Sequence, residues 1–111
     1  MKTNVPNMEK VNPYFHKALR SIYEYGSTNP EIQKMVVFGK ATDLKFTPDR
    51  DDELDVAIFL KNPTQEKVIS IGTEIEKLCA LLWGCMMDDE AYDESILLQR
   101  SVERGVTIYE K

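Results

Sequence analysis

Val36–Lys40 reads VVFGK, an apolar run that ends in a glycine turn, and Glu53–Phe59 reads ELDVAIF, an apolar run opened by two acids. We predict a strand in each stretch, because β-branched and aromatic residues dominate both and Gly39 breaks the first. Side chains alternate faces along a strand, so Glu53 and Asp55 should point the same way, roughly 6.5–7 Å apart along the backbone. Two carboxylates fixed on one face beside a glycine turn suit a divalent cation and a nucleoside triphosphate.

Four strands are expected along the chain, at Lys34–Phe38, Leu54–Leu60, Cys85–Asp88 and Val106–Tyr109. The second is almost continuously apolar, which is typical of a central strand buried on both faces, with Leu54 and Val56 in the core. The polar stretch 40–52 is expected to be a loop, in which Ala41–Leu44 can form a helical turn.

Three segments show the periodicity of amphipathic helices. They are expected at Asn12–Tyr25, from the Asn62–Thr64 start to near Gly84, and at Glu94–Arg104. Gly26 and Gly105 are placed to end the first and third helices, and Ile96, Leu97 and Val102 should face inward in the third. We therefore predict an α+β protein with one mixed β-sheet of about four strands and helices packed on it.

The chain has 111 residues, which suits one domain spanning 1–111. No apolar run is long enough for a transmembrane helix, and the N-terminal residues lack the apolar core of a signal peptide. Cys79 and Cys85 have no metal-ligand spacing and are interpreted as reduced thiols of a cytoplasmic protein. The formal charge of −5 argues against nonspecific nucleic-acid binding, which depends on phosphate neutralisation.

The order of these motifs resembles that of the minimal nucleotidyltransferase domains in the DNA polymerase β-like superfamily. The signature of that family is an apolar strand, Gly-Ser, a spacer, and Asp-hydrophobic-Asp at the start of the next strand. Here it corresponds to Phe38–Lys40 and Glu53–Asp55. Val102–Glu110 is similar to the helix, Glu-Gly-Val and strand that end the small prokaryotic members. The resemblance covers about residues 12–111 and implies a nucleotidyltransferase-like fold.

The resemblance also implies a reaction, the magnesium-dependent transfer of a nucleoside monophosphate from a triphosphate, with ATP the expected donor, to a protein or small acceptor. Two Mg²⁺ ions would clamp the attacking and leaving oxygens. By position, Glu53 and Asp55 would be the paired metal ligands and Asp88 the third acid. Gly39 and Lys40 would contact the phosphates.

Two substitutions depart from the family pattern. Lys40 stands where the family has serine, and Glu53 stands where it has aspartate, which moves the ligand oxygen by one methylene. Asp89 is an alternative to Asp88, because the register of that strand is open. The alternative function is therefore a weakened or inactive nucleotidyltransferase-like module that acts by nucleotide binding or by contact with a protein.

Small family members often pair with a separate HEPN-type protein, as antitoxin and toxin, and the resemblance implies such a partner here. Self-association through an edge strand at Val106–Tyr109 is a further option. Each site residue also has a plainer interpretation. Acids at a strand start often serve as soluble gatekeepers, Gly39 can simply provide a turn with positive φ, and Lys40 can be an exposed lysine.

Overall fold

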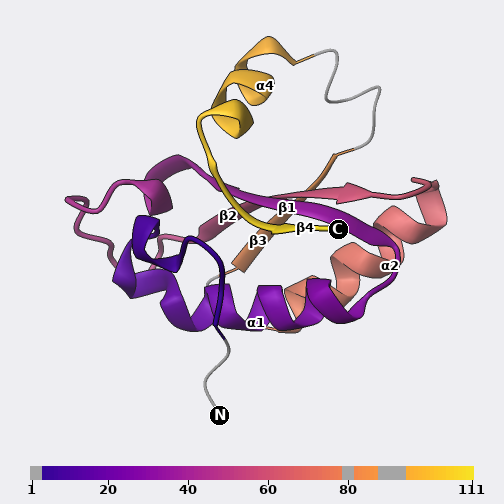
Figure 1. Ribbon diagram of the computed structural model, residues 1–111, viewed down its shortest axis with the longest axis horizontal. Coiled ribbons are helices and arrows are strands. Elements are labelled where there is room, and N and C mark those ends of the chain that lie inside the picture. The colour runs from indigo at the N-terminus through magenta and orange to yellow at the C-terminus, as the bar shows by residue number, and fades with distance from the viewer. Residues whose placement is uncertain (1–3, 79–81, 88–94) are drawn as a thin grey trace.

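The computed structural model describes residues 4–78, 82–87 and 95–111, and within them the chain is a small α+β protein (Figure 1). Its strands form one sheet in the order β3-β2-β1-β4. The strands are β1 (Ile32–Phe38), β2 (Leu54–Leu60), β3 (Leu82–Met87) and β4 (Val106–Glu110). The helices are α1 (His16–Thr28), α2 (Gln65–Glu76) and α4 (Ile96–Glu103), with short 3-10 helices η1 (Met8–Lys10), η2 (Pro13–Phe15) and η3 (Gly39–Thr42). β1 pairs antiparallel with β2 and β4, whereas β3 lies parallel to β2.

The two faces of the sheet are covered unequally (Figure 1). α1 and α2 lie under one face, and their apolar side chains form the larger core with that face. α4 lies over the other face, where Val102 packs with Val36, Phe38 and Ala57 in a smaller cluster. Burial against α1 and α2 therefore provides most of the hydrophobic stabilisation.

The predicted bounds of the second strand are confirmed. β2 is Leu54–Leu60, and Leu54 and Val56 are fully buried in the larger core, as the alternation of a strand requires. Ala57 is buried on the opposite face, whereas Asp55 and Phe59 are only partly buried. A central strand covered on both faces therefore retains one accessible carboxylate near its start.

The first helix differs from the prediction at both ends. The Asn12 side chain accepts a hydrogen bond from the Tyr14 amide (3.1 Å), but the turn that it caps is η2, and α1 begins only at His16. Gly26 does not end the helix, which continues to Thr28. Gly26 is buried against Met35, whose side chain a Cβ at this position would overlap. The glycine therefore allows the helix to approach β1 closely.

The second helix is shorter than predicted, because α2 begins after its Thr64 cap and ends at Glu76. Leu82, Trp83 and Gly84, which the prediction placed at the end of this helix, belong to β3, which also starts earlier than the predicted Cys85. A short apolar run has no clear period, so pairing with β2 decides its conformation.

The inward face predicted for the third helix is partly wrong. Val102 is buried, but Ile96 and Leu97 are 62% and 78% exposed. The hydroxyl of Ser95 caps the Leu98 amide (3.2 Å) and starts the helix there. In that phase Leu98 and Val102, four residues apart, face the sheet, and Ile96 and Leu97 point away.

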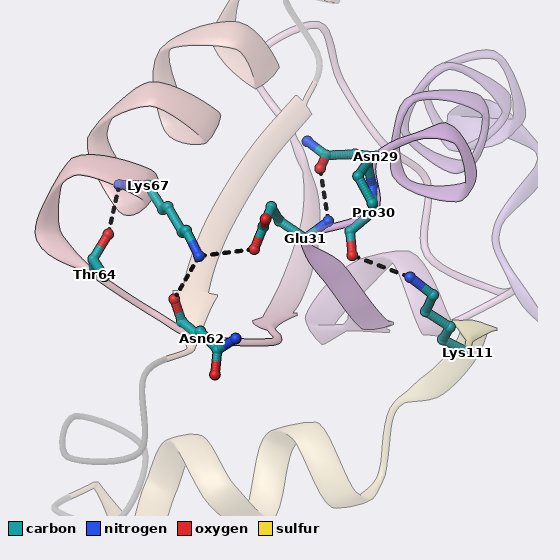
Figure 2. Close-up of polar contacts among 7 residues, drawn as sticks. All are labelled: Asn29, Pro30, Glu31, Asn62, Thr64, Lys67 and Lys111. Carbon is teal, nitrogen blue, oxygen red and sulfur yellow. Dashed lines mark hydrogen bonds and ion pairs between the residues drawn. The ribbon is translucent and has the colours of Figure 1, made fainter.

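At the end of the sheet where β2 finishes, a polar cluster joins distant segments (Figure 2). The Lys67 ammonium donates to the Glu31 carboxylate (2.9 Å) and to the Asn62 carbonyl (3.1 Å). The Lys111 ammonium donates to the Pro30 carbonyl (3.1 Å). The hydrogen bond from Lys67 lowers the pKa of Glu31. These contacts connect the start of β1, the β2–α2 connection and the C-terminal residue.

Candidate functional site

The glycine turn after β1 lies directly against Asp55. Phe38, the last residue of β1, pairs with Asp55 across the antiparallel ladder, so the turn begins beside this carboxylate. Gly39 has a φ of 77°, a conformation that residues with a Cβ rarely adopt. A Cβ built on Gly39 would lie 2.9 Å from the Asp55 Oδ2 atom. Glycine is therefore required by the backbone conformation and by the closeness of the acid.

An open polar pocket of about 490 Å³ lies at this end of β2. Lys40, Asp51, Asp52, Glu53 and Asp55 line it. Alternation along the strand predicts Glu53 and Asp55 on one side, and both residues line this one pocket. With their carboxylates ionised, these described lining residues carry four negative charges and one positive charge.

Asp55 is the electrostatically unusual member of the pocket. No hydrogen bond or ion pair holds its carboxylate within the described ranges, although it is partly buried. Burial raises the pKa of Asp55, the neighbouring charge of Glu53 raises it further, and the Lys40 charge lowers it in part. A proton or a cation would relieve the cost of this partly desolvated charge.

Lys40 contacts the loop that borders the pocket. Its Nζ lies 3.5 Å from the Asp52 Oδ1 atom and 5.5 Å from the centre of the Phe46 ring. The Lys40 side chain is nevertheless 68% exposed. Among the described residues of the pocket it is therefore the accessible cation, and its charge is directed at Asp52.

Asn12 connects the loop to the start of the first helical segment. It is 4% exposed, and its amide group donates to the carbonyls of Asp43 (3.0 Å) and Phe46 (2.8 Å). Its backbone N–H donates to the Ala41 carbonyl (2.7 Å). The sequence identified Asn12 only as a helix cap, because no local pattern indicates hydrogen bonds to residues some thirty positions away. Asn12 thus positions the segment that carries Lys40 and Phe46.

The predicted third acid, Asp88 or Asp89, lies outside the described residues. β3 pairs with β2 so that Trp83 is opposite Asp55, and Met87 is opposite Phe59. Because β3 contains no acidic residue, its described part brings no carboxylate beside Asp55. In the described ranges, no three His, Cys, Asp or Glu side chains gather closely enough to hold a metal ion.

The donors that are present still suit magnesium. Mg²⁺ prefers hard oxygen ligands and is often held by only one or two carboxylates, with water and substrate phosphates completing its shell. Glu53 and Asp55 provide two such groups in one pocket, and Asp55 lacks a competing partner among the described residues. These two acids are therefore the candidate metal ligands of the described chain.

No family model, curated protein or solved structure matches this chain. Within the described ranges, none of the helices has the length and apolarity needed to cross a membrane. The site is therefore defined by its own geometry and electrostatics.

Proposed function

We propose that the chain is a magnesium-dependent nucleotidyltransferase, which moves a nucleoside monophosphate from ATP or another triphosphate to a protein or small acceptor. The observation that carries this proposal is the Asp55 carboxylate. It is partly buried, has no hydrogen bond or ion pair within the described chain, and lies against Gly39 and beside Glu53 in an open pocket. A carboxylate kept in this state favours a cationic ligand.

Each residue has a stated role in this proposal. Glu53 and Asp55 would hold magnesium, which neutralises phosphate charge and aligns the reacting groups when bound. Lys40 would bind a phosphate oxygen. Gly39, which lacks a Cβ, keeps the Oδ2 atom of Asp55 accessible and leaves room for phosphate near the backbone.

The charge of the pocket also makes binding conditional on the cation. The described lining residues carry a formal excess of three negative charges, which would repel a bare triphosphate. Magnesium bound to the acids or to the nucleotide would remove that repulsion. We therefore expect nucleotide binding to be negligible in EDTA.

A second candidate is a module that binds nucleotide without turnover. The register of β3 favours it, because Trp83 rather than an acid lies opposite Asp55. The two departures from the family that the sequence resembles, Lys40 for serine and Glu53 for aspartate, also favour this second candidate. A separate protein partner would then carry the biological output.

The test uses α-labelled ATP with Mg²⁺ or Mn²⁺, and the chain itself or added proteins as acceptors. We expect label transfer that falls by about 100-fold or more in Asp55→Asn. Glu66→Gln, at the opposite end of the sheet, removes the same charge and should leave transfer unchanged. Binding of Mg·ATP in equilibrium dialysis without transfer would support the second candidate, and absence of binding would contradict both.

Glu53→Asp tests the role of Glu53 separately. The shorter side chain restores the ligand reach of the resembling family, so we expect transfer to increase, by up to about 100-fold if misplacement by one methylene limits the rate. The initial rate of label transfer at saturating Mg²⁺ measures the effect. A lower rate would mean that Glu53 does not occupy the position of the first family acid.

A further inference from the structure

Lys40 and Asp52 form an ion pair in which the acid is held more firmly than the lysine. The Oδ1 atom of Asp52 lies 3.5 Å from the Lys40 Nζ, and its Oδ2 accepts a hydrogen bond from the Asp49 amide (2.8 Å). The Asp52 side chain is 21% exposed, against 68% for Lys40. The turn Asp49–Asp52 thus fixes a carboxylate against the accessible cation of the pocket.

We infer that Asp52 is an internal competitor for phosphate, which occupies the Lys40 ammonium and thereby lowers the affinity of the pocket for nucleotide. The inference rests on the proposed function, because it concerns the same pocket. A phosphate oxygen and the Asp52 carboxylate are both anions, and Lys40 is the one cation among the described residues that line this pocket. A ligand must therefore displace Asp52 or share Lys40 with it.

Lys40 is placed so that it can still bind a ligand after its ion pair with Asp52 is broken. Its ammonium also lies over the Phe46 ring, and the Asn12 amide anchors the Phe46 carbonyl. The contact with the Phe46 ring keeps the Lys40 ammonium near the pocket when the ion pair with Asp52 is broken. An ion pair this exposed is weak, so the competition should be moderate, and a multiply charged phosphate should overcome it.

Asp52→Asn separates the competing charge from the structural role of Asp52. The amide oxygen of asparagine can still accept the hydrogen bond from the Asp49 amide, while its NH₂ group offers no charge to Lys40. Asp51→Asn is the matched control, since Asp51 lines the same pocket but forms no ion pair with Lys40. Both variants remove one negative charge from the lining, and only the first releases the lysine.

The experiment measures the Kd of Mg·ATP by equilibrium dialysis for the wild type and both variants, with thermal unfolding as a check on the fold. We expect Asp52→Asn to bind about three- to fivefold more tightly than Asp51→Asn. In a Lys40→Met background this difference in affinity should disappear, because Asp52 then has no ammonium group to pair with.

Each outcome decides between the two proposals. Equal affinities of Asp52→Asn and Asp51→Asn would overturn the competitor and leave the proposed function intact. Weaker binding by Asp52→Asn would also overturn it, and would mean that Asp52 positions Lys40 for the ligand. If wild type and variants all fail to bind Mg·ATP or Mn·ATP, the proposed function fails and the competitor with it.

Discussion

At the scale of single residues, Asp55 and Asn12 differ in how their polar groups are paired. Asp55 is a partly desolvated carboxylate without a hydrogen bond or ion pair in the described chain, whereas Asn12 is buried and makes several hydrogen bonds. Residues kept at a cost to stability are common at functional sites, and well-paired buried polar residues are common in supporting structure. We therefore expect replacement of Asp55 to raise the stability of the fold and replacement of Asn12 to lower it.

We predict that Asp55→Asn raises the Tm at neutral pH. The pKa of Asp55 is raised above its ordinary value of 3.8, so the native state binds more protons than the unfolded state, and stability falls as pH rises through the folded pKa. The gain from the substitution should therefore be present at pH 7 and vanish below about pH 4, where the wild-type carboxyl is protonated in both states. Thermal unfolding between pH 3.5 and 8 measures it.

Magnesium should reverse the order of the two proteins. At ten times its Kd, a ligand of the native state stabilises by about 1.4 kcal/mol, and only the wild type should gain this. Glu66→Gln is the control for loss of a carboxylate elsewhere. A large loss of stability in Asp55→Asn without metal would mean that the carboxylate has a structural role instead.

Asn12→Ala should lower the free energy of unfolding by about 2–3 kcal/mol, because it removes a cap and leaves two backbone carbonyls without their donor. Asn12→Asp separates these effects, since aspartate keeps the acceptor for the Tyr14 amide but cannot donate to Asp43 and Phe46. Urea unfolding compares the variants. Wild-type stability in Asn12→Asp would show that only the cap matters.

At the scale of elements, close approach decides where helices meet strands. Gly105 joins α4 to β4, and a Cβ there would lie 2.5 Å from the Val37 carbonyl oxygen and 2.6 Å from Val36 Cγ1. The turn is therefore packed directly on β1. Gly72, inside α2, has no atom within 4 Å of such a Cβ. Gly105 therefore stands in a tightly packed turn, whereas Gly72 stands at an open position within a helix.

Gly105→Ala should destabilise the fold by about 1–3 kcal/mol, because the added methyl must push α4 and β4 away from β1. Gly72→Ala, the matched control, should stabilise by about 0.5–1 kcal/mol, since alanine is the better residue inside a helix. Chemical denaturation measures both. Equal effects would mean that the α4–β4 turn has room to adjust.

At the scale of the whole molecule, the inner strands of the sheet are better covered than its edge strand β4 and the face under α4. β1 and β2 are the inner strands, and β1 has a hydrogen-bonded neighbour on each side. β4 is an edge strand, although the Asn7 amide donates to its Thr107 carbonyl (2.8 Å). α4, which covers the second face, is short and leaves Ile96 and Leu97 exposed.

Hydrogen exchange should follow this arrangement. Amides of Met35–Val37 and Val56–Ile58 should exchange slowest, with protection close to that of global unfolding, and those of α4 and β4 at least about 10-fold faster. Exchange followed by mass spectrometry on peptides that separate these elements would measure it. Equal protection in β4 and β1 would mean that the edge is covered in solution, as self-association would do.

The fold was predictable from the sequence where a local pattern is sufficient. The strand Leu54–Leu60 and the burial of Leu54 and Val56 follow from alternation alone. The extent of α2 and the inward face of α4 were wrong, because an apolar run takes its conformation from the neighbour that it pairs with. The glycines show the same limit: Gly105 follows the last helix as expected, but Gly26 lies inside α1, against Met35.

Local patterns in the sequence are therefore sufficient to predict the α+β class and the position of Glu53 and Asp55 at the start of a buried strand, since both depend on residues close together in the chain. Three other features became visible only in the folded chain: Asp55 has no hydrogen-bonding or ionic partner among the described residues, Lys40 faces Asp52, and Trp83 of β3 lies opposite Asp55. These depend on how distant segments pack, because the charge and hydrogen bonding of a side chain are set by the neighbours that folding brings to it.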